Sequence, residues 1–204
     1  MARGRRLLPV AALALSASAF GAAPATAHPH VFIDYAVTVM FDDRGPAAVH
    51  FLWVFDAMYS SMLIRDFTSR PAGQLTAADV ANLRKKAFED TADFNYFTDL
   101  TVNGKALKIK KVTDFNARVD RGHISYAFTV PMPDGAPTGP GSLEVASFDH
   151  EFYISFQLIK GAPITVKSGE KLGATCKQKT VTKDTSFFGP IDAIVVACSY
   201  GKAG

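Results

Sequence analysis

The stretch that decides the fold reads VFIDYAVTVMF and covers residues 31–41. Apolar residues occupy every second position, and Asp34 and Thr38 are among the residues between them. Because successive side chains of a strand point to opposite faces, this alternation predicts a half-buried β-strand. Turn-forming residues follow at 42–46, and a second alternating run covers residues 49–55. The two runs therefore predict a β-hairpin.

The period of the apolar residues changes to three or four after this second run. This spacing predicts one helix beginning near Met58 and a second beginning near Thr76. Residues 69–73 contain Pro and Gly and break both helices. Thr76 and Asp79 form a variant of the capping box, in which Asp replaces the usual Glu. We therefore expect a helical hairpin near residues 57–92, inserted into an otherwise β protein.

Short strand-like runs separated by turn residues make up the rest of the chain. Asn103-Gly104 predicts a two-residue hairpin turn. Alternating runs at 124–130 and 152–158 predict further strands, whereas the Pro and Gly residues of 131–141 predict a loop. We therefore expect an α+β fold that is mainly β, built from antiparallel sheets or a sandwich.

The first 27 residues have the three parts of a secretory signal. They contain a basic start, an apolar stretch at 7–20, and small residues at Ala25 and Ala27. We expect residues 1–27 to be removed on export, leaving 28–204 as a single periplasmic domain. The adjacent Arg5 and Arg6 weakly resemble a twin-arginine signal, so the sequence leaves the export route open.

The charge balance argues against a nucleic-acid partner. The net charge of the chain is +3, and Arg3, Arg5 and Arg6 account for all of it, because the remaining chain has 19 basic and 19 acidic residues. A balanced domain lacks the basic surface that nucleic acid or an acidic membrane attracts. The part that follows residue 27 also has no apolar run of membrane-spanning length.

The chain has two cysteines, Cys176 and Cys198. In an exported protein an isolated pair is best interpreted as one structural disulfide. A thiolate metal site is the weaker alternative, because two sulfurs alone make an incomplete ligand set.

His28 and His30 are the main candidate metal ligands. Cleavage after Ala27 would place an α-amine and an imidazole on His28, and residues two apart on a strand share a face, so His30 can add a third nitrogen. Nitrogen ligands suit zinc, nickel, cobalt or copper, and the sequence does not select among these ions. The alternative is a pair of ordinary exposed histidines near a chain end.

Asp149 and His150 are the candidates to complete such a site from a distance. They lie between a strand and the apolar run at 152–158, at a sheet margin where ligands can gather. A turn Asp with solvated neighbours explains them equally well. His50 and His123 are weaker candidates, because histidine has many roles other than metal binding.

Motifs of common enzyme classes are absent from the sequence. It contains no nucleophile elbow, no paired-histidine zinc motif, no P-loop and no dinucleotide fingerprint. We therefore expect no catalytic residues of these classes.

Several motifs, taken together, match one family of exported bacterial proteins. The matching segments, in chain order, are residues 28–34, 53–56, 59–60, 96–97, 102–105, 148–149 and 152–154. With these motifs the chain resembles the domain-of-unknown-function family one thousand and seven, described as a periplasmic component of an ABC-type transport system. Members are often encoded beside nickel/cobalt permeases, so the resemblance implies a periplasmic role in divalent-metal handling.

One departure from the family pattern concerns calcium. Many relatives look as if they carry an EF-hand-like loop between the two helices. With Gly73 as its central glycine and Asp79 as its closing acid, the first three ligand positions fall on Thr68, Arg70 and Ala72. An Arg cation opposes calcium and Ala offers no ligand, so we expect this loop to be calcium-free.

These observations favour a metal-binding accessory protein that serves a membrane metal transporter or its periplasmic components, with His28 and His30 as principal ligands. Two alternatives stay open. A copper ion held by an N-terminal histidine brace could activate oxygen in an enzyme. A protein-interaction module could present aromatic residues such as Trp53, Tyr59 and Phe97, although these residues fit a core better.

The signal sequence generates the first testable prediction. Protein recovered from the periplasm should begin at His28, because Ala25 and Ala27 stand at the small-residue positions of the cleavage site. Intact-mass measurement decides this. A start several residues later would remove both histidines and eliminate the proposed site.

Overall fold

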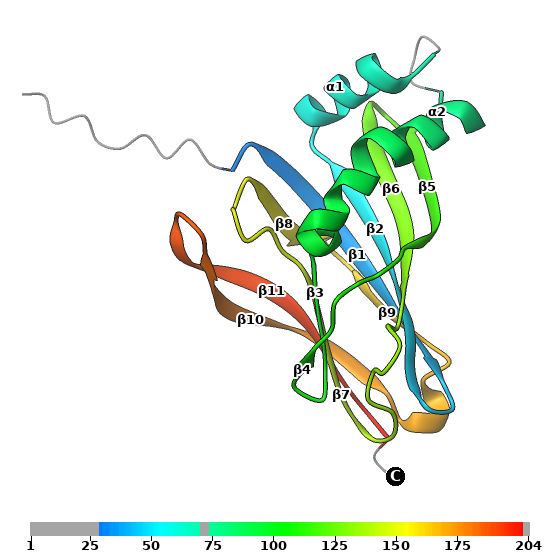
Figure 1. The fold of residues 1–204 in the computed structure, drawn as a ribbon, viewed down its shortest axis with the longest axis vertical. Helices are drawn as coiled ribbons and strands as arrows, with labels where there is room; N and C mark the ends of the chain where they lie inside the picture. The colour runs from blue at the N-terminus through cyan, green and yellow to red at the C-terminus, as the bar shows by residue number, and fades with distance from the viewer. Residues whose placement is uncertain (1–28, 70–73, 202–204) are drawn as a thin grey trace, which may run out of the picture.

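The computed structural model describes residues 29–69 and 74–201, which fold into two β-sheets with helices across one end of the first (Figure 1). The first sheet has the strand order β5 (Thr113–Asp120), β6 (His123–Pro131), β2 (Gly45–Phe55), β1 (Val31–Asp42) and β8 (Ile154–Leu158), and β9 (Ile164–Lys167) also pairs with β1. The second has the order β10 (Thr175–Thr185), β11 (Gly189–Tyr200), β7 (Gly141–Ser147), β3 (Thr98–Val102) and β4 (Lys105–Ala106). The mainly β fold expected from the sequence is confirmed.

Strands β1 and β2 form the predicted hairpin. The alternating residues of β1 are buried and those between them are partly or fully exposed. The strands are antiparallel, with Tyr35 opposite Trp53, and β2 begins at Gly45, four residues before its alternating run. The half-buried strand predicted from periodicity is therefore confirmed.

The first sheet is mixed rather than wholly antiparallel. β8 runs parallel to β1 beside its first half, with Val31 opposite Ile154, and β9 runs parallel to its second half, with Val37 opposite Ile164. The expectation of antiparallel pairing alone was wrong here. Periodicity reports which face of a strand is buried, but contains nothing about its neighbour's direction.

The two sheets enclose the core, and polar contacts from Tyr35 and Trp53 join them. The Tyr35 hydroxyl donates to the Ile194 carbonyl at 3.2 Å, and the Trp53 indole N–H donates to the Ser147 hydroxyl at 3.1 Å. Burial raises the pKa of Tyr35 to about 12, so the phenol keeps its proton. Buried polar groups need such partners, and here the partners lie on the opposite sheet.

The helical insertion consists of α1 (Ala57–Phe67) and a second helical segment that changes type along its length. This segment comprises α2 (Ala77–Leu83), the π-helix η2 (Arg84–Phe88) and the 3-10 helix η3 (Glu89–Phe97). Helical backbone angles stop at Phe94, close to the limit near residue 92 expected from the sequence, and a turn with positive φ angles continues to Phe97. The Ser60 hydroxyl donates to the Phe55 carbonyl and accepts from the Ile124 amide, which attaches α1 to the sheet.

Asp79 connects the ends of α1 and α2. The predicted capping box with Thr76 is present, and the same carboxylate also accepts the amide and hydroxyl hydrogens of Ser69. Hydrogen bonds from Thr76 are the main reason why the pKa of Asp79 lies below its usual value. Stability from this group is therefore present above its unfolded-state pKa and is lost as pH falls through the lower folded-state value. Arg70, Ala72 and Gly73 of the EF-hand-like alignment lie outside the described residues.

The remaining predicted turns are also found. Asn103 and Gly104 have φ angles of 51° and 77° and join β3 to β4, as a hairpin turn with two positive φ angles requires. The predicted loop at 131–141 connects β6 to β7. In the part of the chain that the structure describes, no helix is long and apolar enough to cross a membrane.

Cys176 and Cys198 form the expected disulfide. They face each other in the β10–β11 ladder and lie 22 residues apart in the sequence. Such bonds are typical of proteins that fold in an oxidising compartment.

Replacing Cys176→Ser together with Cys198→Ser should lower the free energy of unfolding by about 2–4 kcal/mol, because the bond restricts the unfolded chain. Urea denaturation of the wild type and the double variant measures the difference. Thiol counting on denatured, unreduced wild-type protein should find none; two free thiols would contradict the pairing.

Candidate functional site

His30 lies on the surface at the beginning of the described chain, one residue before β1. Its amide donates to the Tyr153 carbonyl at 2.9 Å, and the two ring centroids are 4.8 Å apart. The backbone of His30 is thus fixed to the segment that leads into β8. His28 lies outside the described residues.

Asp56 attaches the start of β1 to the start of α1. Its carboxylate accepts the amide hydrogens of Phe32 and Tyr59, each at 2.9 Å, and its own amide donates to the Phe32 carbonyl. One side chain therefore caps α1 and extends the pairing of β1 at its first residues. His30 precedes a strand that is held along both edges, by Asp56 and by the segment containing Tyr153.

Asp149 is buried, with 3% of its surface exposed, and points into its own loop. Its carboxylate accepts the amide hydrogens of Glu151, Tyr153 and Ile154, each at 2.9 Å. These bonds shape the turn that places Tyr153 beside His30. The Asp149 carboxylate, which the sequence predicted as a distant metal ligand, thus accepts hydrogen bonds from the backbone of its own loop.

His150, the next residue, contacts the second sheet. Its Nε2 lies 3.1 Å from an oxygen of Asp99 on β3, and the Lys183 ammonium from β10 pairs with the other oxygen of the same carboxylate. Its ring also contacts the edge of Phe148. Within residues 29–69 and 74–201, no group of three or more His, Cys, Asp or Glu residues is placed to hold a metal ion. The structure therefore does not bring His30, Asp149 and His150 together as one ligand set.

The two weaker histidine candidates bond to neighbouring strands. His50 Nδ1 lies 3.0 Å from the Thr129 hydroxyl, and burial lowers the pKa of this imidazole, with Lys167 adding to the effect. His123 Nδ1 lies 2.8 Å from the Phe55 carbonyl. Each contact gives its histidine a structural role in the first sheet.

Tyr153 and Asp56 are site residues that the sequence analysis did not select. Both belong to segments that carry the family resemblance, and this membership was the signal in the sequence that could have identified them. The role of Tyr153 depends on β8 lying parallel to β1, which no local pattern specifies. Asp56 instead holds Phe32 across the β1–β2 hairpin.

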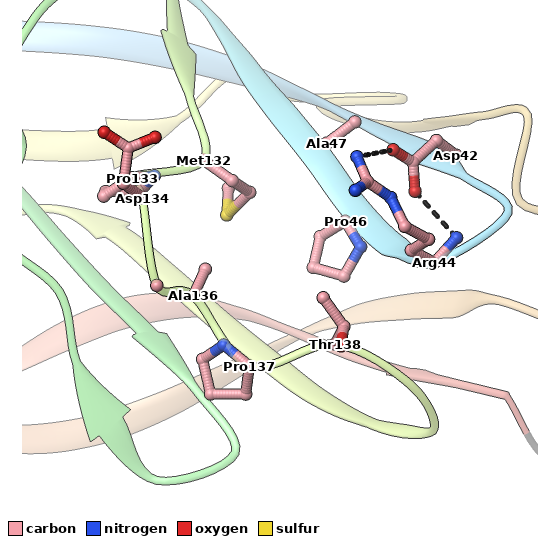
Figure 2. Close-up of a pocket in the computed structure, with 11 residues that line it drawn as sticks. Asp42, Arg44, Pro46, Ala47, Met132, Pro133, Asp134, Ala136, Pro137 and Thr138 are labelled. Carbon is pink, nitrogen blue, oxygen red and sulfur yellow. Dashed lines mark hydrogen bonds and ion pairs between the residues drawn. The ribbon is translucent and has the colours of Figure 1, made fainter.

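One surface hollow lies at the far end of the β1–β2 hairpin and has a volume of about 290 Å³. Figure 2 shows Asp42 and Arg44 turned toward each other on one side, with Asp134 and Met132 across from them. The Arg44 amide donates to the Asp42 carboxylate at 2.8 Å, and this bond is the main reason for the lowered pKa of Asp42. Because the Asp42 carboxylate and the Arg44 guanidinium are paired with each other, neither charge is left for a ligand.

A second cavity, of about 220 Å³, lies between the first sheet and the helices, on the same end of the molecule as His30. Eight of its lining residues are aromatic, and Trp53, Tyr59 and Phe97 are among them. Trp53 is buried and the other two are partly buried, which agrees with their expected place in the core. Tyr153 lines this cavity and also contacts His30.

The loop geometry gives a test of the role of Asp149. Asp149→Ala should lower the free energy of unfolding of metal-free protein by about 2–4 kcal/mol, because three amide hydrogens lose a charged acceptor. Glu151→Ala, which leaves that carboxylate in place, should change it little. Urea denaturation in the presence of a chelator measures both. An unchanged stability of Asp149→Ala would show that the loop does not depend on this carboxylate.

Comparison with known proteins agrees with the resemblance noted in the sequence. Residues 13–186 match the family described as "Protein of unknown function (DUF1007)". The chain is also 26% identical over 106 residues to an "Uncharacterized 15.5 kDa protein in trpE 3'region" of Spirochaeta aurantia, a match that covers 52% of this chain and 74% of that protein. Because the family match spans most of the sequence, this chain is a member of the DUF1007 family.

Proposed function

We propose that this protein is an exported, periplasmic metal-binding accessory protein that captures or passes on a divalent transition-metal ion for a membrane transporter. The observation that supports this most directly is the position of His30. Its ring is exposed, while its backbone is bonded to a neighbouring strand segment. A fixed backbone lowers the entropy lost when an imidazole binds an ion.

The ligand set consists of His30 with the ring and α-amine of His28. Asp149 and His150, the two distant candidates, have partners of their own in the loop and on Asp99. The proposal therefore places all the metal-coordinating nitrogens on the first three residues of the exported chain. Three nitrogen donors suit zinc, nickel, cobalt or copper.

An incomplete ligand set suits transfer better than storage. Structural zinc sites close four protein ligands around the ion, whereas a site with three donors leaves a position open. An exchange partner can enter at that position before the first ligands leave. This is the chemistry required to hand an ion to a transporter.

Export is supported by the disulfide and by the signal-like start of the sequence. Cys176 and Cys198 are bonded, and disulfides persist in oxidising compartments such as the periplasm. A protein in that compartment meets metal ions before they cross the inner membrane.

The metal site generates the next prediction. Protein with an authentic His28 N-terminus should bind at least one of zinc, nickel, cobalt or copper in calorimetric titration, and calcium should not bind. His28→Ala and His30→Ala should each weaken binding by at least the roughly 10–100-fold that even outer-shell partners contribute. Affinity should fall as pH is lowered, because the amine and both imidazoles must lose protons before they can coordinate the ion.

His123→Ala is the matched control, because this histidine bonds to the Phe55 carbonyl and should leave affinity unchanged. One extra residue before His28 should weaken binding if the α-amine is a ligand. A copper complex that turns over oxygen would identify a histidine-brace enzyme in place of a carrier. Failure of native-start protein to bind any of the four ions, or unchanged binding in both histidine variants, would favour the interaction-module alternative.

A further inference from the structure

The aromatic cavity beside the helices has the size of a small-molecule site. Its volume of about 220 Å³ exceeds the roughly 150 Å³ of an engineered apolar cavity that binds benzene. Its walls come from β1, β2 and β6 of the sheet, from α1 and η2–η3, and from the residues leading into β8. Trp53 is part of the wall and is the single tryptophan of the chain.

Aromatic rings dominate the cavity wall and come partly in stacked pairs. Phe94 and Phe97 stack with centroids 5.4 Å apart, and Phe55 and Tyr59 stack at the same separation. The faces of such rings carry partial negative charge. A wall of this kind attracts a cation that has shed its water.

The ionised side chain in the cavity lining is negatively charged, like the faces of the aromatic rings. Asp90 is the one charged residue in its lining among the described residues. Burial, then Tyr153 and then Asp56 raise the pKa of Tyr59, so a second carboxylate acts on this wall. An anionic ligand would be repelled here, whereas a cation would be paired.

Tyr126 supplies an unsatisfied polar group. It lines the cavity and is 3% exposed, and its hydroxyl has no hydrogen-bond partner among the described residues. Buried hydroxyls without partners are rare in folded proteins. The hydroxyl oxygen is closed to solvent, so a ligand in the cavity would reach it only if neighbouring side chains moved.

The backbone that borders the cavity is unusual in two places. Asn95, Tyr96 and Phe97 have consecutive φ angles of 54°, 53° and 44°, and the Asn95 side chain holds this turn by accepting from the Ile109 amide at 2.8 Å. The π-helix η2 supplies Ala87 and Phe88 to the wall. Strained turns and π-helical segments concentrate at functional sites.

We propose that this cavity binds a small organic ammonium ion with an apolar body, held by cation–π contacts with the aromatic wall and by Asp90. This site is separate from the nitrogen ligands of the metal proposal and requires no metal. It adds a small-molecule ligand class to the function of the protein.

Three probes with nearly the same body separate charge from shape. They are choline, the neutral 3,3-dimethylbutan-1-ol and the anion 3,3-dimethylbutyrate, each titrated into full-length mature protein with a chelator present. Trp53 fluorescence reports occupancy and calorimetry gives affinity. Choline should bind at least tenfold more tightly than the alcohol, and the anion should not compete with it.

Variants then locate the site. Asp90→Asn and Phe94→Leu should each weaken choline binding at least threefold, and both residues are exposed enough to be changed without disturbing the core. Asp93→Asn is the matched control, since Asp93 is an exposed acid on the same helix that does not line the cavity. Thermal unfolding checks that each variant is folded. Equal binding of choline and the alcohol, tighter binding of the anion, no binding of choline at millimolar concentration, or an equal effect of Asp93→Asn would each overturn the proposal.

Discussion

Strand β1 is paired along both edges, and its register fixes the rest of the molecule. β2 pairs antiparallel along one edge, while β8 and then β9 pair parallel along the other. A shift of one residue would expose every buried side chain of β1, because side chains alternate between faces. Tyr35 would then lose its bond to the second sheet. The same register places His30 beside Tyr153 and closes one side of the aromatic cavity.

Three carboxylates, those of Asp56, Asp79 and Asp149, accept hydrogen bonds from backbone amides. Asp56 joins β1 to α1, Asp79 joins α1 to α2, and Asp149 forms the turn before β8. Each accepts several hydrogen bonds, which compensates the charge for loss of water. These three acids hold the ends of the strands and helices around the cavity. None of them lines the cavity itself.

One residue, Tyr153, connects the proposed metal ligands with the aromatic cavity. Tyr153 contacts the His30 ring and lines the cavity. Its position is set by the hydrogen bond that its amide donates to the Asp149 carboxylate and by the pairing of the following residue, Ile154, with Val31. An occupant of the cavity would therefore lie against the same phenol ring that contacts His30, so the two proposals place their ligands at the same end of the molecule.

The sequence by itself determined the features that depend on neighbouring residues. These include the β1–β2 hairpin, the Thr76–Asp79 capping box, the Asn103-Gly104 turn, the cysteine pair and membership of the family. Only the tertiary structure decided that β8 and β9 run parallel to β1, that Asp149 and His150 face different partners, and that Trp53, Phe97 and Tyr153 meet around one cavity. The physical reason is that alternation and capping act over a few residues, whereas strand order and ring contacts depend on how distant segments bury their apolar faces together.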